Sequence, residues 1–175
     1  MKDLKKAENT IKYLKHILKN PALSKSDRKL ANKLLEGLIK ALGGTKIMKF
    51  ETIYTDFKNL FPEEKEYFST CEKNSVIGDE GDELSHMSFG IFIMPFIYRL
   101  LESEDDARLR KAFSFFEDMA KSEDDRVQNL LQVTILENLT TESEEIYKAA
   151  QKYIGPETKK FVNQVATYMY IEPMI

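Results

Sequence analysis

The sequence predicts an all-α protein, and three observations support this. Apolar residues recur at alternating steps of three and four along most of the 175 residues, which is the spacing of one face of a helix. The tetrapeptide Ser-Glu-Asp-Asp occurs at 103–106 and again at 122–125, each time before a run with helical periodicity. Alternation of polar and apolar residues, which marks strands, never persists for long. We therefore expect stacked helical hairpins, an irregular helical repeat of the HEAT type, preceded by an N-terminal helical hairpin.

The first 47 residues predict that N-terminal hairpin. Its first helix ends at Asn20-Pro21 and has an apolar stripe made of Leu4, Ala7, Ile11, Leu14 and Leu18. Its second helix is capped by Ser26-Asp27 and ends at Gly43-Gly44. One face of this helix is apolar and consists of Ala31, Leu34, Leu38 and Leu42.

Charge divides the chain at the end of this hairpin. Residues 1–47 carry twelve Lys/Arg against four Asp/Glu, a net charge of +8. Residues 48–175 carry fourteen against twenty-five, a net charge of −11. We therefore predict two domains, a basic helical hairpin (1–47) and an acidic α-helical body (48–175).

The first half of the body predicts three helices. Two fall at about 50–60 and 62–72, and Pro62 suits the first turn of the second because a missing N–H matters little there. An acidic loop follows, and Ser85 is expected to cap the next helix, from His86 to Glu102. That helix is apolar nearly all round, with Ile91 among its apolar residues, so we expect it at the buried centre, kinked by Pro95.

The second half predicts four more helices, at 104–121, 123–139, 142–153 and from Pro156 to about Tyr170. The serines of the two Ser-Glu-Asp-Asp motifs are expected to cap the first two. Thr141 with Glu144 resembles a capping box before the third. Acids behind each cap suit the positive end of the helix dipole.

The residue inventory argues against catalysis and metal binding. His16 and His86 are remote from each other and from Cys71, and neither stands in a metal-ligand pattern. Cys71 has no basic neighbour beyond Lys73, and no nucleophile elbow or phosphate-binding glycine motif occurs. We predict no enzyme activity, no metal and no cofactor.

Hydropathy predicts a cytoplasmic protein without a membrane segment. The longest uncharged apolar stretch, 87–98, has twelve residues, well short of the roughly 20 that cross a bilayer. The first residues lead into an amphipathic segment, so we expect no signal peptide. A single cysteine fits a reducing compartment.

The hairpin carries a set of lysines that can be interpreted in two ways. They are Lys5, Lys12, Lys15, Lys19, Lys29, Lys33 and Lys40. They suit binding of a phosphate backbone, or they form a solvated helix face. The second reading is favoured because no aromatic or arginine cluster accompanies them.

The body carries acids at the predicted helix N-termini that would suit a basic protein partner: Asp79, Glu80, Asp82, Glu83, Asp105, Asp106, Asp124 and Asp125. If the N-termini meet, these acids form one surface, and charge of one sign steers association. Capping and solubility are the alternative reasons for their presence.

Three segments carry a family resemblance: 108–119 (RLRKAFSFFEDM), 125–139 (DRVQNLLQVTILENL) and 153–161 (YIGPETKKF). They resemble small all-α bacterial proteins, some of which look like immunity proteins of contact-dependent growth inhibition and related polymorphic toxin systems. The resemblance covers about residues 48–165, and the N-terminal hairpin departs from it. It implies a cognate toxin, often a nuclease, as the partner.

The sequence thus favours an immunity protein that binds and neutralises a toxin without catalysis. Two alternatives stay open: a nucleic-acid-binding regulator that uses the hairpin, and a helical adaptor.

Overall fold

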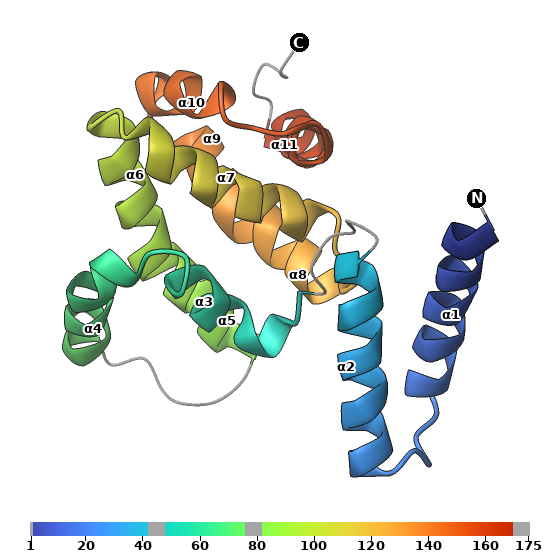
Figure 1. The fold of residues 1–175 in the computed structure, drawn as a ribbon. Helices are drawn as coiled ribbons and strands as arrows, with labels where there is room; N and C mark the ends of the chain where they lie inside the picture. Colours follow the sequence, from blue (N-terminus) through green and yellow to red (C-terminus); the bar gives the residue numbers. More distant parts are fainter. Residues whose placement is uncertain (1, 42–47, 76–81, 170–175) are drawn as a thin grey trace. The chain divides into compact units, whose positions relative to one another are not determined.

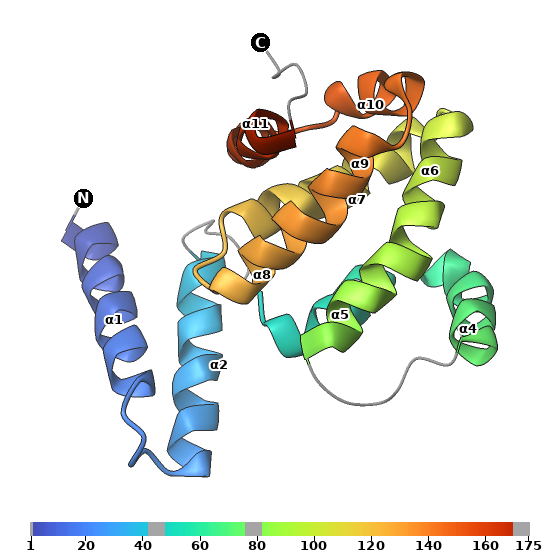
Figure 2. The same ribbon diagram turned by 180° about the vertical axis from the view of Figure 1, so that it is seen from behind.

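The computed structural model describes residues 2–41, 48–75 and 82–169, and it confirms the all-α fold, since every regular element in these ranges is helical. The chain divides into two compact units, Met1–Ile47 and Met48–Ile175 (Figures 1 and 2). The HEAT-like repeat stays a prediction. None of the described helices combines the length and the apolar character that a membrane span requires.

The first unit is a hairpin of α1 (Lys2–Leu18) and α2 (Lys25–Ala41). Leu14, Ala31 and Leu35 are buried between them. Leu34, expected on this inner face, is 52% exposed, whereas Leu35 is 3% exposed. Both follow Ala31 at a helical step, three or four residues on, so periodicity alone does not separate them.

The start of α2 lies one residue before the predicted cap. The Ser24 hydroxyl accepts the N–H of Asp27 at 3.1 Å and donates to the Asp27 carboxylate at 2.7 Å. A cap side chain reaches the N–H three residues on, so Ser24 fills the role that the sequence suggested for Ser26-Asp27.

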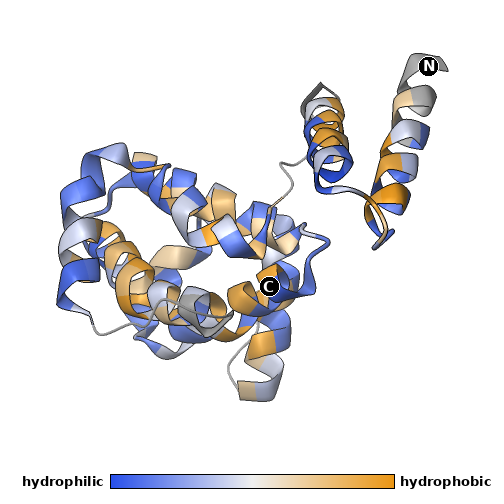
Figure 3. Ribbon diagram, turned by 90° about the horizontal axis from the view of Figure 1, so that it is seen from below, coloured by the Kyte–Doolittle hydropathy of each residue, from blue (hydrophilic) through white to orange (hydrophobic). Residues whose placement is uncertain are grey.

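The body is built from helices that are interrupted by short 3₁₀ and π turns. Its 3₁₀ turns are η1 (Phe50–Thr52) and η2 (Pro62–Glu64), and its π-helical segments are η3 (Phe89–Ile93) and η4 (Leu131–Leu136). Its α-helices are α3 (Ile53–Lys58), α4 (Lys65–Asn74), α5 (Asp82–Ser88), α6 (Met94–Glu102), α7 (Asp106–Ala120), α8 (Asp125–Leu130), α9 (Glu137–Thr141), α10 (Glu144–Gln151) and α11 (Pro156–Met169). The helical ribbons carry both polar and apolar residues, as amphipathic packing units do (Figure 3).

Two of these starts differ from the expectation. Helix α5 begins at Asp82, so Ser85 lies inside it and does not cap it. Helix α10 is capped by Ser143, whose hydroxyl accepts the N–H of Ile146 at 3.2 Å, and not by Thr141.

Two long helical rods contain a π turn each, a feature that hydrophobic periodicity does not reveal. One rod is α5–η3–α6 and the other is α8–η4–α9. Pro95 is the second residue of α6, and α6 follows η3 directly. Proline has no N–H and its ring crowds the carbonyl four residues back, so a wider turn at this point accommodates it.

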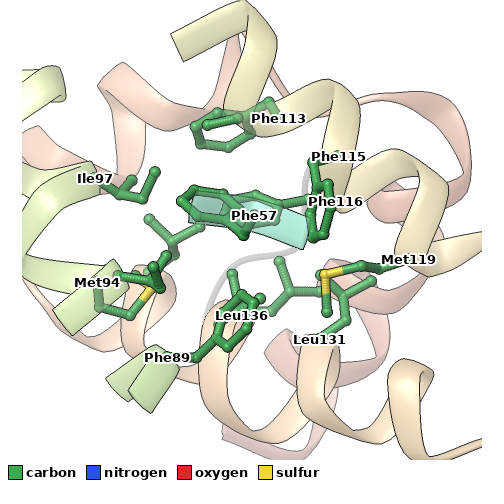
Figure 4. Packing of buried hydrophobic residues seen from close by; sticks show 14 of the residues in the cluster. Phe57, Phe89, Met94, Ile97, Phe113, Phe115, Phe116, Met119, Leu131 and Leu136 are labelled. Atoms are coloured by element: carbon green, nitrogen blue, oxygen red, sulfur yellow. The ribbon is translucent and has the colours of Figure 1, made fainter. Parts of the chain in front are cut away.

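The core of the body is centred on Phe57 of α3, which is fully buried (Figure 4). Its ring has a stacked neighbour in Phe116 at 6.0 Å and edge-on neighbours in Phe115 and Phe96 at 5.3 and 6.4 Å. The core also includes residues near the start of the unit, since Met48, Phe50 and Ile53 are all buried.

A buried carboxylate ties α7 to α11. Glu117 is 9% exposed, and it accepts the N–H groups of Glu157 (3.1 Å) and Thr158 (2.9 Å) and the Thr158 hydroxyl (2.8 Å). These N–H groups lie in the first turn of α11, where they have no partner within the helix. Gly155, before Pro156, has no side chain to cap this turn, so Glu117 of another helix caps it.

Candidate partner-binding surface

The acids at the start of α7 cap the helix and pair with arginines of the same helix. Asp105 is the N-cap: its carboxylate accepts the Arg108 N–H at 3.1 Å and its guanidinium at 2.7 Å. The backbone hydrogen bond, followed by the guanidinium, holds the pKa of Asp105 below its usual value. Asp106 accepts two hydrogen bonds from Arg110, at 2.7 and 3.2 Å.

The start of α8 repeats this arrangement. Asp124 is the N-cap and accepts the Arg126 N–H at 3.0 Å, and its other oxygen pairs with the guanidinium at 2.9 Å. Arg126 also pairs with Glu51 at 2.8 Å and lies over the Phe50 ring, 5.1 Å from its centre. Asp125, in the first turn, is exposed.

The serines of both Ser-Glu-Asp-Asp motifs play a different part from the one expected. Ser103 donates its hydroxyl to the Leu100 carbonyl of the preceding helix, at 3.3 Å. Ser122 accepts the N–H of Asp124 at 3.1 Å, and so orients the residue that caps. In each motif the first aspartate is the cap.

The structure separates the predicted acids at the start of α7 from those at the start of α8. Helix α7 has fifteen residues, so Asp105 and Asp106 at its start lie about 22 Å from the turn that leads to α8. Successive helices of an antiparallel pair begin at opposite ends, which is why the two acid pairs separate (Figure 1). Asp79 and Glu80 fall outside the described residues, and Asp82 and Glu83 belong to the first turn of α5.

Exposed apolar side chains mark a different surface of the body. They are Met87 (42% exposed), Ile91 (52%), Val133 (39%) and Tyr168 (48%). The sequence placed Ile91 in the buried centre because its helix is apolar nearly all round. Singly exposed apolar residues are ordinary, whereas adjacent ones indicate a contact surface.

Three of these four residues lie on the two rods where the rods touch. The His86 ring nitrogen Nδ1 lies 2.6 Å from the Thr134 hydroxyl, and a side chain on Gly90 would meet the Thr134 methyl at 3.8 Å. Ile91 follows Gly90, and Val133 precedes Thr134. Met87 lies one turn before Ile91.

The two rods run in the same direction. His86, near the start of the first rod, contacts Thr134, just past the middle of the second. Further along both rods, burial and then Glu142 raise the pKa of Tyr98 to about 12, which places Glu142 close to that phenol. Figure 2 shows the rods side by side with the same orientation. Side chains along two parallel right-handed helices rotate in the same sense, but the contact points of the two helices face each other. The residue that follows the contact on one helix therefore points to the same side of the pair as the residue that precedes the contact on the other.

Ile91 and Val133 therefore share one side of the rod pair. Glu137 follows Val133 by one helical turn, and its carboxylate accepts the Tyr168 hydroxyl of α11. Tyr168 thus borders the same side. We call the surface formed by Met87, Ile91, Val133 and Tyr168 the apolar face.

Other parts of the body are weaker candidates for a functional site. Across the described residues, no three His, Cys, Asp or Glu side chains are grouped as they would be around a metal ion. A shallow cleft of about 250 Å³ opens between α7 and the segment before α11, beside Arg110, Ser114 and Tyr153. Its acid is Glu117, which is already engaged by α11.

The lysines of the hairpin are outward-facing where their side chains are described. Lys12, Lys19, Lys29 and Lys33 are exposed and Lys15 is half-buried. This exposure agrees with a solvated face and with phosphate binding alike, so both readings stay predictions.

Comparison with known proteins gives a family match. The model of the family "Domain of unknown function (DUF7674)" matches residues 54–170. No curated protein and no solved structure matches the chain significantly. The match covers most of the body, including both rods, α7 and α11. This chain therefore belongs to the DUF7674 family.

Proposed function

We propose that this protein binds a cognate bacterial toxin and neutralises it by protein–protein contact, without catalysis. The observation that carries the proposal is the apolar face, because Met87, Ile91 and Val133 are exposed on the two rods beside the place where the rods touch. The sequence resemblance to immunity-type proteins supplies the class of partner.

A specific complex needs a larger surface than these four side chains. Stable interfaces bury roughly 1,600 Å² in total. Their binding energy concentrates in a few central apolar or aromatic residues surrounded by a polar rim. In the apolar face, Glu137 supplies a polar group at the edge, beside Tyr168.

Co-expression with the toxin domain encoded by a neighbouring gene tests the proposal. We expect the toxin domain alone to stop growth of a bacterial host and this protein to restore it. The purified partners should form a complex with a Kd below about 1 μM, since standard-size interfaces reach that affinity. Growth counts and isothermal titration calorimetry measure both.

A chain with a destabilised core, Phe57→Ala, is the negative control, since a chain that does not fold should neither bind the toxin nor restore growth. Absence of both rescue and binding with the neighbouring toxin domain would contradict the proposal. Salt-dependent binding of RNA or DNA by the full chain, without toxin rescue, would favour a regulator instead.

A further inference from the structure

The hairpin of α1 and α2 buries little of its own surface. Among its described side chains, the buried ones are Leu14, Ala31 and Leu35. Arg28 closes the turn between the helices by donating to the Leu18 carbonyl at 2.6 Å. Units of this size usually need a cross-link, a metal ion or association with another chain. A disulfide within the hairpin is excluded, because the single cysteine of the sequence is Cys71.

Three large apolar side chains of the hairpin are exposed on one of its sides. They are Tyr13 (64%), Leu30 (58%) and Leu34 (52%), and each directly precedes one of the three buried residues. Helices α1 and α2 are antiparallel (Figure 1), so their side chains rotate in opposite senses when viewed along the hairpin, while their contact points face each other. Residues that precede the contacts therefore point to the same side on both helices. We call the surface formed by Tyr13, Leu30 and Leu34 the hairpin patch.

Lysines of the hairpin point away from the hairpin patch. Lys15 directly follows the buried Leu14, so it turns to the opposite side of the hairpin. Lys12, Lys29 and Lys33 are exposed, and each stands two residues before a buried contact. Two helical steps are a rotation of about 200°, which turns these three side chains outward. The apolar and the basic side chains of the hairpin are thus directed differently.

This separation disfavours a membrane or a nucleic acid as the occupant of the hairpin patch. Either of them would have to meet lysines and the apolar residues on one surface, or lysines alone. A second copy of this chain meets the patch with an identical patch, which is what a two-fold interface requires. It also leaves most of the lysines on the outer sides of the pair, where salt screens their repulsion.

The size of the hairpin suits a reversible dimer. Each helix has 17 residues and is therefore about 26 Å long, and two packed helices are about 20 Å across. One side of the hairpin thus measures about 500 Å², and two copies face to face bury on the order of 1,000 Å², the lower limit for a specific interface.

We propose that two copies of this chain associate through the hairpin patch, so that their hairpins form a four-helix bundle. The bundle supplies the burial that a single hairpin lacks. The inference goes beyond the proposed function and is independent of it, since the hairpin lies outside the residues that the family match covers. A dimer of this kind carries two copies of the apolar face.

Analytical ultracentrifugation of the full chain tests the proposal without the toxin. Between about 1 and about 200 μM, we expect the mass to rise from 20.3 kDa towards twice that value, with a Kd between about 1 and 100 μM. Raising the salt concentration from about 0.15 to about 0.5 M should leave the Kd unchanged or lower it, because salt screens the repulsion between the lysines.

Substitution identifies the surface. Leu34→Lys should weaken the dimer by at least about tenfold, because it places two like charges in one interface, and Leu30→Lys should act likewise. Asn32→Lys is the matched control, since Asn32 lies between them on α2 but directly follows Ala31 and so turns to the opposite side. It should leave the Kd within about twofold. Circular dichroism confirms that each variant is folded.

Methyl NMR of the full chain locates the contact independently. On dilution, the signals of Leu30 and Leu34 should shift. A chain that stays monomeric at about 200 μM would overturn the proposal. So would a dimer that both patch variants leave intact, a dimer that salt dissociates, and dilution shifts confined to the body. Failed toxin rescue with a dimer that the patch variants break would refute the toxin and keep the dimer, and the reverse result would do the opposite.

Discussion

Replacing Phe57 with alanine should lower the free energy of unfolding of the body by about 3–5 kcal/mol. The ring is fully buried and lies within 6.4 Å, centre to centre, of rings from α3–η2, η3, α6 and α7. Removal leaves a cavity where four segments meet, and aromatic pairs add to the loss. Urea unfolding followed by near-ultraviolet circular dichroism measures it, because seven of the eight tyrosines lie in 48–175.

Tyr13→Ala provides the comparison. Tyr13 is an aromatic residue of the hairpin with 64% exposure, so its removal should change stability by no more than about 0.5 kcal/mol. A loss below about 1 kcal/mol for Phe57→Ala would show that the aromatic cluster does not hold the body together.

The second large effect concerns the contact between α7 and α11. Glu117→Ala should destabilise the body by about 2–4 kcal/mol, because it leaves three donors of the first turn of α11 without an acceptor in a buried place. Glu144→Ala is the matched control: Glu144 also pairs with a lysine four residues on, but its side chain is 76% exposed. Exposed pairs of this kind contribute little.

Gly155 gives a double-mutant test of the same contact. A Cβ on Gly155 would overlap the Glu117 carboxylate, lying 2.6 Å from Cδ. Gly155→Ala should therefore destabilise the wild type by about 1–3 kcal/mol and have a much smaller effect once Glu117 is alanine. Additive losses would show that the two residues act independently.

Acid should weaken this contact in a defined pH range. Burial alone would raise the pKa of Glu117, but the N–H groups of Thr158 and Glu157, the Thr158 hydroxyl and Lys121 lower it below its usual 4.5. A carboxyl group with a lowered pKa in the folded state stabilises fully above its unfolded value and loses that stabilisation as pH falls through the folded value. The stability difference between wild type and Glu117→Gln should therefore shrink below about pH 4.5. A constant difference down to pH 3 would contradict the assignment.

The all-α class and most helix positions follow from the sequence because helical periodicity is a local property. The cap residues follow less well. In each Ser-Glu-Asp-Asp motif, both serine and aspartate can cap, and the choice depends on how the preceding helix ends. At the first motif Glu104 adopts a left-handed φ of 53°, which places Asp105 and not Ser103 at the start of α7.

The apolar face is visible in the sequence only in part. That Met87, Ile91 and Val133 are apolar can be read from the sequence, but that η3 and η4 pack together is a tertiary fact. Ile91 sits in a run of apolar residues, and one added residue in a π turn rotates its neighbours relative to an ideal helix. The Glu117 contact to α11 spans forty residues, and no local pattern indicates it.

The family match and the folded body begin at different residues. The family match starts at residue 54, whereas Met48, Phe50 and Ile53 are buried in the body. Glu51, also outside the match, holds Arg126. A fragment cut at the family limits would thus uncover part of its own interior and lose an ion pair at the start of α8. For expression, crystallisation or binding studies, the shortest self-sufficient fragment should begin no later than Met48.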